Sequence, residues 1–112
     1  MTIAERHEGN VIVLAPTGKI VLDNNGTLKG KVASLLAEGN KQLIIDLAGV
    51  TMIDSSGLGE LVSCHTAASR EKGGVKLVNL GKRTTDLLVM TKLIMVFNVY
   101  DSEKEALASF AS

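Results

Sequence analysis

The chain has 112 residues, of which 46% are hydrophobic and 21% are charged, a composition typical of one folded domain and unlike that of disordered chains. Its twelve basic and twelve acidic residues balance, so it lacks the positive field expected of a nucleic-acid-binding protein. A single cysteine excludes an internal disulfide bond, and a polar N-terminus without a long apolar run argues against a signal peptide or a membrane span. We therefore expect one cytoplasmic domain over residues 1–112, with no direct contact to nucleic acid or membrane.

The first predicted elements are the two strands of a β-hairpin. Residues 3–7 and 11–15 flank a Gly-Asn pair at residues 9 and 10, which is a two-residue turn signal. Pro16 and Gly18 are expected to end the second strand, because proline has no N–H to donate and glycine favours turns.

A helix is predicted next, from Asn24 or Asn25 to Glu38, with an asparagine as N-cap and Gly39 as the stop. Its apolar residues recur at helical spacing, at Leu28, Val32, Leu35 and Leu36. The short apolar run of residues 43–47 is typical of a strand that is covered on both faces.

The second half of the chain repeats this alternation. A helix is expected at residues 57–72, closed by the glycines at 73 and 74, with an inner stripe of Leu58, Leu61, Val62, His65 and Ala68. A strand at residues 75–80, a short helix at 84–91 and a strand at 95–100 follow, and Ser102 with Glu105 forms a capping box for a last helix. The sequence predicts an α/β fold: a mixed, mostly parallel sheet of about four or five strands that opens with an antiparallel hairpin and is covered by about four helices.

The segment between the strand at 43–47 and the following helix carries the functional signal. It places an acid, two hydroxyls and two glycines in six residues: Asp54, Ser55, Ser56, Gly57 and Gly59. Ser55 lies beside the expected helix start, where unpaired backbone amides favour an anion, and the glycines let a partner approach closely. The same residue types are also ordinary helix caps, and composition alone favours capping.

Residues 44–59, IIDLAGVTMIDSSGLG, resemble the signature stretch of the STAS family, in which many members are anti-sigma-factor antagonists. Further matches to the family pattern lie at residues 73–79, 87–88, 91–93, 96–97, 100–101 and 105–107, so the resemblance covers nearly the whole chain. In that family the serine after the loop aspartate is phosphorylated by the anti-sigma factor, which is itself a serine kinase. The resemblance assigns this role to Ser55 and implies a binding protein that releases a sigma factor, is reset by a serine phosphatase and is not an enzyme.

The resemblance also implies a partner-binding surface. It comprises the loop and the first helical turn, Asp54, Ser55, Ser56, Gly57, Leu58 and Gly59, together with Asp23 and Asn24 from the segment before the first helix. Family members often carry Gly-x-Leu-Asp in that segment. Here residues 18–26 read GKIVLDNNG, so placing Asp23 at the corresponding position requires a longer loop.

Other functions fit the sequence less well. Nucleophilic catalysis by Ser55 with His65 lacks a Gly-x-Ser-x-Gly elbow, and His65 is expected to be a partly buried helix residue. A receiver domain would need an acidic pair after the first strand, where Ala15-Pro16-Thr17 stands instead. No residues specify a cofactor, and Cys64 has no partner at metal-site spacing. A STAS module of another system, such as a stressosome-like scaffold, a lipid-transport complex or a transporter, stays open.

Overall fold

The computed structural model describes residues 1–111. The strands are β1 (Thr2–Glu8), β2 (Val11–Ile20), β3 (Gln42–Asp46), β4 (Val50–Ile53), β5 (Gly74–Val78) and β6 (Asn98–Tyr100). The α-helices are α1 (Thr27–Ala37), α2 (Ser55–Arg70), α3 (Lys82–Met90) and α4 (Glu103–Ala111), and the short 3-10 helices are η1 (Leu22–Asn24) and η2 (Leu93–Met95).

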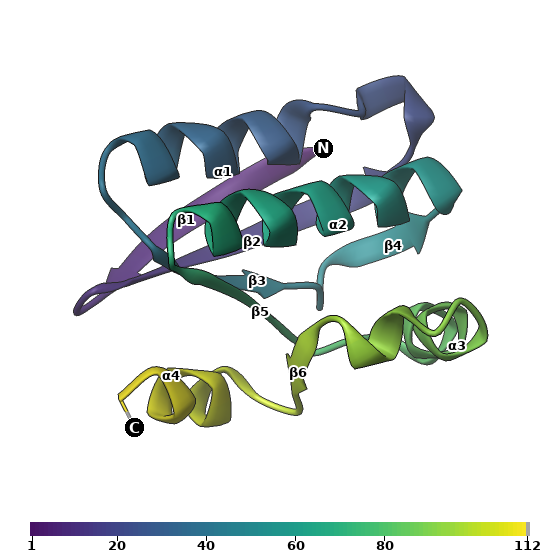
Figure 1. Cartoon of the computed structure of the whole chain (residues 1–112). Coiled ribbons are helices and arrows are strands. Elements are labelled where there is room, and N and C mark those ends of the chain that lie inside the picture. The colour runs from purple at the N-terminus through teal and green to yellow at the C-terminus, as the bar shows by residue number, and fades with distance from the viewer. Residues whose placement is uncertain (112) are drawn as a thin grey trace.

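The strands form one mixed sheet in the order β1-β2-β3-β5-β6, with β4 paired to the end of β2. Only the β1–β2 pair is antiparallel; the remaining pairs are parallel. Helices α1 and α2 lie side by side on one face, whereas α3 and α4 lie on the other side of the sheet (Figure 1). This arrangement confirms the predicted α/β class, the opening hairpin and the crossover helices.

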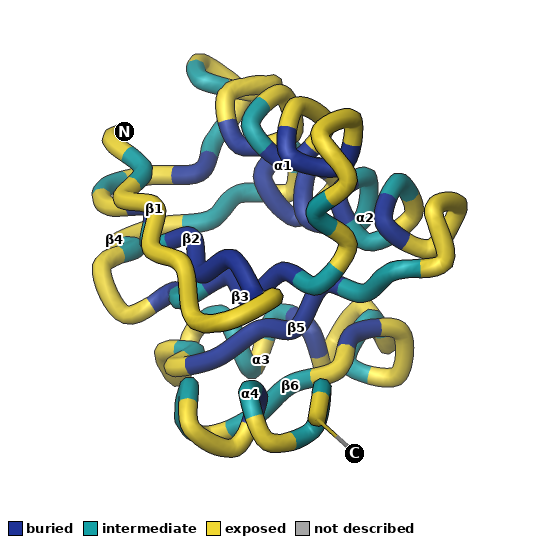
Figure 2. Tube along the Cα trace, turned by 90° about the vertical axis from the view of Figure 1, so that its left-hand side faces the viewer, coloured by how far each residue is buried: buried dark blue, intermediate teal, exposed yellow. Residues whose placement is uncertain are grey.

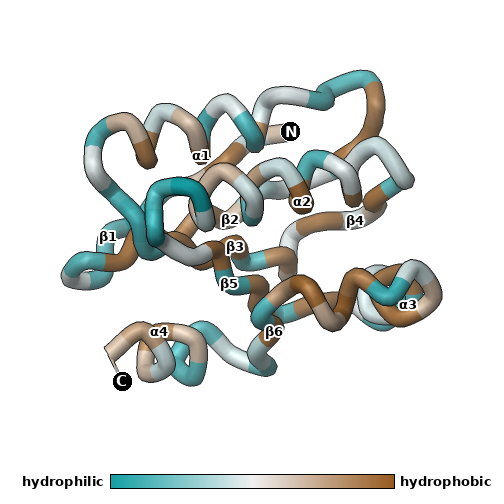
Figure 3. Tube along the Cα trace, viewed as in Figure 1, coloured by the Kyte–Doolittle hydropathy of each residue, from teal (hydrophilic) through white to brown (hydrophobic). Residues whose placement is uncertain are grey.

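Side-chain alternation along the central strands divides the core in two. Ile12 and Leu14 of β2 point to the face covered by α1 and α2, while Val11 and Val13 point to the α4 side, where Ala106 packs. Buried residues are concentrated on β2, β3 and β5 (Figure 2). Hydrophobic residues lie along these strands and also along β4 (Figure 3), although no residue of β4 is fully buried. The predicted inner residues of the first helix, Leu28, Val32, Leu35 and Leu36, are all buried.

The prediction that β2 ends at Pro16 and Gly18 is wrong, since the strand continues to Ile20. Pro16 pairs only with Ile3 of β1, because β3 pairs with β2 up to Leu14 and β4 begins its pairing at Gly18. A proline is tolerated where no strand on that side needs its N–H. Gly18 has a positive φ of 95° and marks a register shift, so it bends the strand without ending it.

Strand β4 was not predicted, and its residues were expected to be part of a loop. The reason is that β2 was predicted to end too early to pair with it. Strand β4 pairs with the last three residues of β2, and these are the residues that lay at and beyond the predicted strand end. Helix α2 follows β4 at once and begins at Ser55, two residues earlier than expected.

The predicted asparagine N-cap of the first helix is also wrong. Residues 22–24 form η1, and α1 starts at Thr27 after Gly26, which has a positive φ of 101° and no side chain to cap with. Gly39 ends this helix as predicted, with a φ of 94° and hydrogen bonds from Gly39 and Asn40 back into the last turn. Helix α2 ends in the same motif, but Lys72 takes the left-handed position before Gly73.

The last third of the chain is close to the prediction. Ser102 accepts a hydrogen bond from the Glu105 N–H at 3.2 Å, as expected at the start of α4. The strand expected at residues 95–100 is shorter, because residues 93–95 form η2 and only residues 98–100 pair with β5.

Candidate functional site

The turn between β4 and α2 is fixed by Asp54. Its carboxylate accepts hydrogen bonds from the N–H of Gly57 at 2.8 Å and from the N–H of Leu22 at 3.1 Å. Its own N–H donates to the Ile20 carbonyl at 3.3 Å. The hydrogen bond from Gly57, with a smaller contribution from Leu22, lowers the pKa of Asp54 below its usual value. Asp54 is therefore the N-cap of α2 and an ionised carboxylate at neutral pH.

Gly57 permits the close approach of α2 to β2. A Cβ atom at this position would lie 1.9 Å from the Ile20 carbonyl oxygen and 2.7 Å from the Ile20 carbonyl carbon. Gly59 lies two residues further along the same helix, and a Cβ atom there would meet no neighbouring atom within 4 Å. The two glycines thus differ: the first is required by packing, and the second leaves open space at the surface.

Capping by Asp54 leaves the two serines with different surroundings. Ser55 is the first residue of α2, is exposed, and its hydroxyl forms no hydrogen bond within residues 1–111. Ser56 is half-buried, and its carbonyl accepts a hydrogen bond from the Asn25 side chain at 3.0 Å. Of the two hydroxyls, that of Ser55 is the more accessible to another protein.

The segment of residues 22–26, which leads into α1, lies at the same end of the sheet as the start of α2 (Figure 1). Asp23 is exposed beside the Leu22–Asp54 hydrogen bond. Asn24 is half-buried, because its side chain donates to the Lys19 carbonyl at 2.7 Å and accepts from the Val21 N–H at 3.0 Å. The structure therefore brings Asp23 and Asn24 beside the Asp54–Ser55 turn.

The sequence-predicted site residues divide by exposure. We define the Ser55 surface as the exposed residues Asp23, Ser55 and Gly59 with the half-buried Asp54, together with the exposed neighbour Leu22. Leu58 is 5% exposed, and Gly57 is buried against β2. Both residues therefore lie below the Ser55 surface and support it by packing.

Two residues here were not predicted from the sequence: Leu22, which is part of the Ser55 surface, and Glu60, which is buried close to it. The apolar side chain of Leu22 is 68% exposed. Glu60, in contrast, is a charged residue that is only 2% exposed. Neither has a local sequence signal, since both depend on how the segment before α1 packs against α2.

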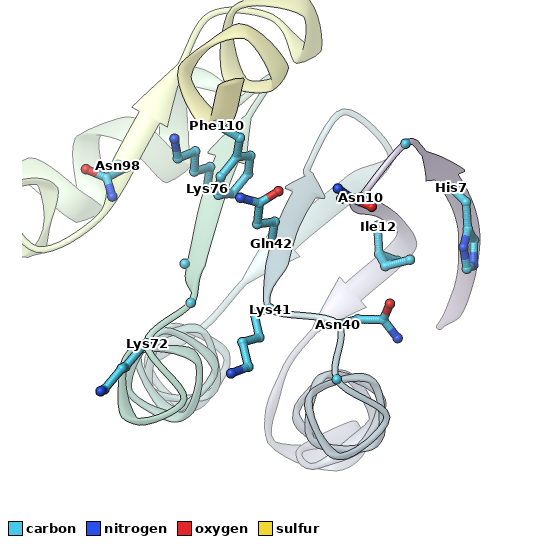
Figure 4. Close-up of a pocket in the computed structure, with 14 residues that line it drawn as sticks. His7, Asn10, Ile12, Asn40, Lys41, Gln42, Lys72, Lys76, Asn98 and Phe110 are labelled. Carbon is cyan, nitrogen blue, oxygen red and sulfur yellow. The ribbon is translucent and has the colours of Figure 1, made fainter. Parts of the chain in front are cut away.

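A pocket of about 680 Å³ lies at the opposite end of the sheet, where the parallel strands begin. Three lysines line it, but their ammonium groups do not converge (Figure 4). Lys41 and Lys72 extend near α2, whereas Lys76 points to Phe110, with its Nζ 3.9 Å from the ring centroid. This pocket is separate from the Ser55 surface.

The described part of the chain contains no group of three or more His, Cys, Asp or Glu side chains placed to hold a metal ion. Among the helices of residues 1–111, none is long and apolar enough to cross a bilayer. His65 is half-buried with its ring edge-on to Phe97, centroid to centroid 5.7 Å, and Cys64 is buried.

The family model of the STAS domain matches residues 2–106. A protein of Thermotoga neapolitana named as an anti-sigma factor antagonist homologue is 29% identical over 99 residues, which cover 88% of each chain.

Solved structures give the same fold. A crystal structure from Thermotoga maritima, also named for an anti-sigma factor antagonist, has a TM-score of 0.92 at 24% identity and covers 98% of this chain and 95% of its own. The Bacillus cell fate determinant SpoIIAA in its phosphorylated form has a TM-score of 0.74 at 15% identity, covering 97% and 99% of the two chains.

Proposed function

The chain belongs to the STAS domain family, and from this membership and the geometry of its Asp54–Ser55 turn we propose that it is an anti-sigma factor antagonist switched by phosphorylation of Ser55. In its unmodified form it binds an anti-sigma factor that is a serine kinase, and this binding releases a sigma factor. The anti-sigma factor antagonists of this family are non-enzymatic regulatory proteins, in agreement with the expectation that the chain is not an enzyme. A serine phosphatase would reset the switch.

One observation carries the proposal: Ser55 is exposed and free of hydrogen bonds to the described residues at the first position of α2, directly after an ionised aspartate. A kinase needs a hydroxyl that it can reach, and a switch needs a position where added charge changes an interface. The existence of a STAS-fold relative named in a phosphorylated form supports the same reaction in this chain.

Phosphorylation at this position should break the interface rather than the fold. A phosphate adds about −1.5 to −2 charges next to the Asp54 carboxylate. The start of α2 offers it little compensation, because Gly57 N–H already bonds the Asp54 side chain and Leu58 N–H the Asp54 carbonyl. An exposed helix end stabilises an anion by about 0.3–1 kcal/mol, whereas like charges forced together in an interface cost several kcal/mol.

The test is phosphorylation by the host's own anti-sigma factor. The protein, Ser55→Ala and the matched control Ser56→Ala are incubated with the kinase and ATP, and the modified residue is located by mass spectrometry. We expect modification of the unsubstituted protein and of Ser56→Ala, and none of Ser55→Ala, which should still bind the kinase. Modification of Ser55→Ala at another residue, or no binding of any variant to an anti-sigma factor, would contradict the proposal.

A further inference from the structure

Glu60 is a buried carboxylate that takes no part in the proposed phosphorylation switch at Ser55. It lies in the second turn of α2 and is 2% exposed, so it cannot itself form part of an interface. Taking a carboxylate out of water is unfavourable unless it is well hydrogen-bonded. The other buried charge among the described residues, Lys76, is accounted for by the Ser109 hydroxyl and the rings of Phe110 and Tyr100.

The hydrogen bonds of Glu60 run to a different helix. Its Oε2 atom accepts from the N–H of Gly26 at 3.0 Å and from the N–H of Lys29 at 2.8 Å. These are amides at the start of α1, which have no partner within the helix. Because Gly26 has no side chain, α1 lacks an N-cap of its own, and Glu60 supplies one from α2. A carboxylate suits this place, since amides and helix dipole both favour negative charge.

This cap is one of three connections between the residue 22–26 segment and α2. The other two are the hydrogen bonds from Leu22 N–H to Asp54 and from the Asn25 side chain to the Ser56 carbonyl. All three acceptors belong to the N-cap and first two turns of α2, around Ser55. The segment that carries Asp23 therefore has its position relative to Ser55 set by α2, and Glu60 is its anchor at the α1 end.

We propose that Glu60 is a positioning residue: by capping α1 it holds residues 22–26 beside Ser55, so that the partner meets both as one surface. The second carboxylate oxygen, Oε1, is buried and has no hydrogen-bond partner within the described residues. The claim that the partner meets both segments as one surface, which we call the docking role, rests on the proposed function. The claim that Glu60 holds residues 22–26 in place, which we call the anchoring role, does not depend on it.

Two measurements on Glu60→Ala and on the conservative variant Glu60→Gln test the anchoring role and the docking role separately. Glu71→Gln, an exposed glutamate at the other end of α2, is the matched control. The first measurement is amide hydrogen exchange. We expect about tenfold faster exchange at Gly26 and Lys29 in Glu60→Ala, with a smaller change in β3 and a partial effect in Glu60→Gln, whose carbonyl can still accept both bonds. Unchanged exchange at these two amides would overturn the anchoring role.

The second measurement is affinity for the anti-sigma factor. We expect Glu60→Ala to bind about tenfold more weakly than the unsubstituted protein, Glu60→Gln to lie between them, and Glu71→Gln to bind normally. Equal binding by all variants, with faster exchange at Gly26 and Lys29, would overturn the docking role while leaving the proposed function intact. If the unsubstituted protein binds no anti-sigma factor, the proposed function and the docking role fail together, and hydrogen exchange still decides the anchoring role.

Discussion

Replacing Gly57 by alanine gives a sharp test of how α2 is seated on β2. The new Cβ would lie 1.9 Å from the Ile20 carbonyl oxygen, a distance that real Cβ atoms essentially never show; they keep at least 3.0 Å. The helix start must therefore move away by about 1.1 Å, the difference between these two distances. Such a shift would also break the 3.3 Å hydrogen bond from Asp54 N–H to the same carbonyl.

The expected loss of stability follows from both effects. Overpacking costs about 1–3 kcal/mol, and the lost hydrogen bond adds about 1 kcal/mol, so Gly57→Ala should be about 2–4 kcal/mol less stable. Gly59→Ala is the matched control: its Cβ has open space, and alanine in a helix is about 0.5–1 kcal/mol more favourable than glycine. Urea unfolding followed by circular dichroism measures both variants. An unchanged urea midpoint for Gly57→Ala would refute the close contact with Ile20.

Two further predictions concern titratable groups. Because hydrogen bonding lowers the pKa of Asp54 in the folded state, its contribution to stability is present above the ordinary aspartate pKa of about 3.9 and is lost as the pH falls through the lowered value. The free energy of unfolding of Asp54→Asn should therefore depend less on pH below about 4 than that of the unsubstituted protein. The same pH dependence in both proteins would contradict this. Burial raises the pKa of Cys64 to about 12, so its thiol should resist a thiol reagent at about pH 8 in the native protein and react once the chain is unfolded in urea. Rapid reaction of the native thiol would contradict its buried position.

The order of apolar and polar residues in the sequence was enough to predict the elements whose apolar residues follow a regular helical spacing or form one short run. The inner face of α1 and the buried residues of β3 follow directly from apolar spacing, and Gly39 ends α1 through a left-handed conformation that glycine favours. The end of β2 could not be predicted in this way. Whether Pro16 ends a strand depends on which neighbour faces it, and that is a property of the sheet.

At the candidate site too, the sequence predicted local features but not those that depend on contacts between distant segments. The sequence located Ser55 at the start of a helix, but not the preceding strand or the identity of the cap. Asp54, rather than a serine, caps α2, and this leaves the Ser55 hydroxyl free of partners among the described residues. Glu60 could not be identified, because its partners Gly26 and Lys29 lie more than thirty residues away and only packing of α1 against α2 brings them together.

The Ser55 switch is tested most directly by the dissociation constant of the complex with the anti-sigma factor, measured by titration calorimetry before and after stoichiometric phosphorylation of Ser55. Repulsion of several kcal/mol predicts binding weaker by about a hundredfold or more, with an unchanged urea midpoint for the free protein. Equal affinity of the two forms would contradict a charge switch at Ser55. A loss of affinity accompanied by unfolding of the phosphorylated protein would contradict the claim that the phosphate acts on the interface and leaves the fold intact.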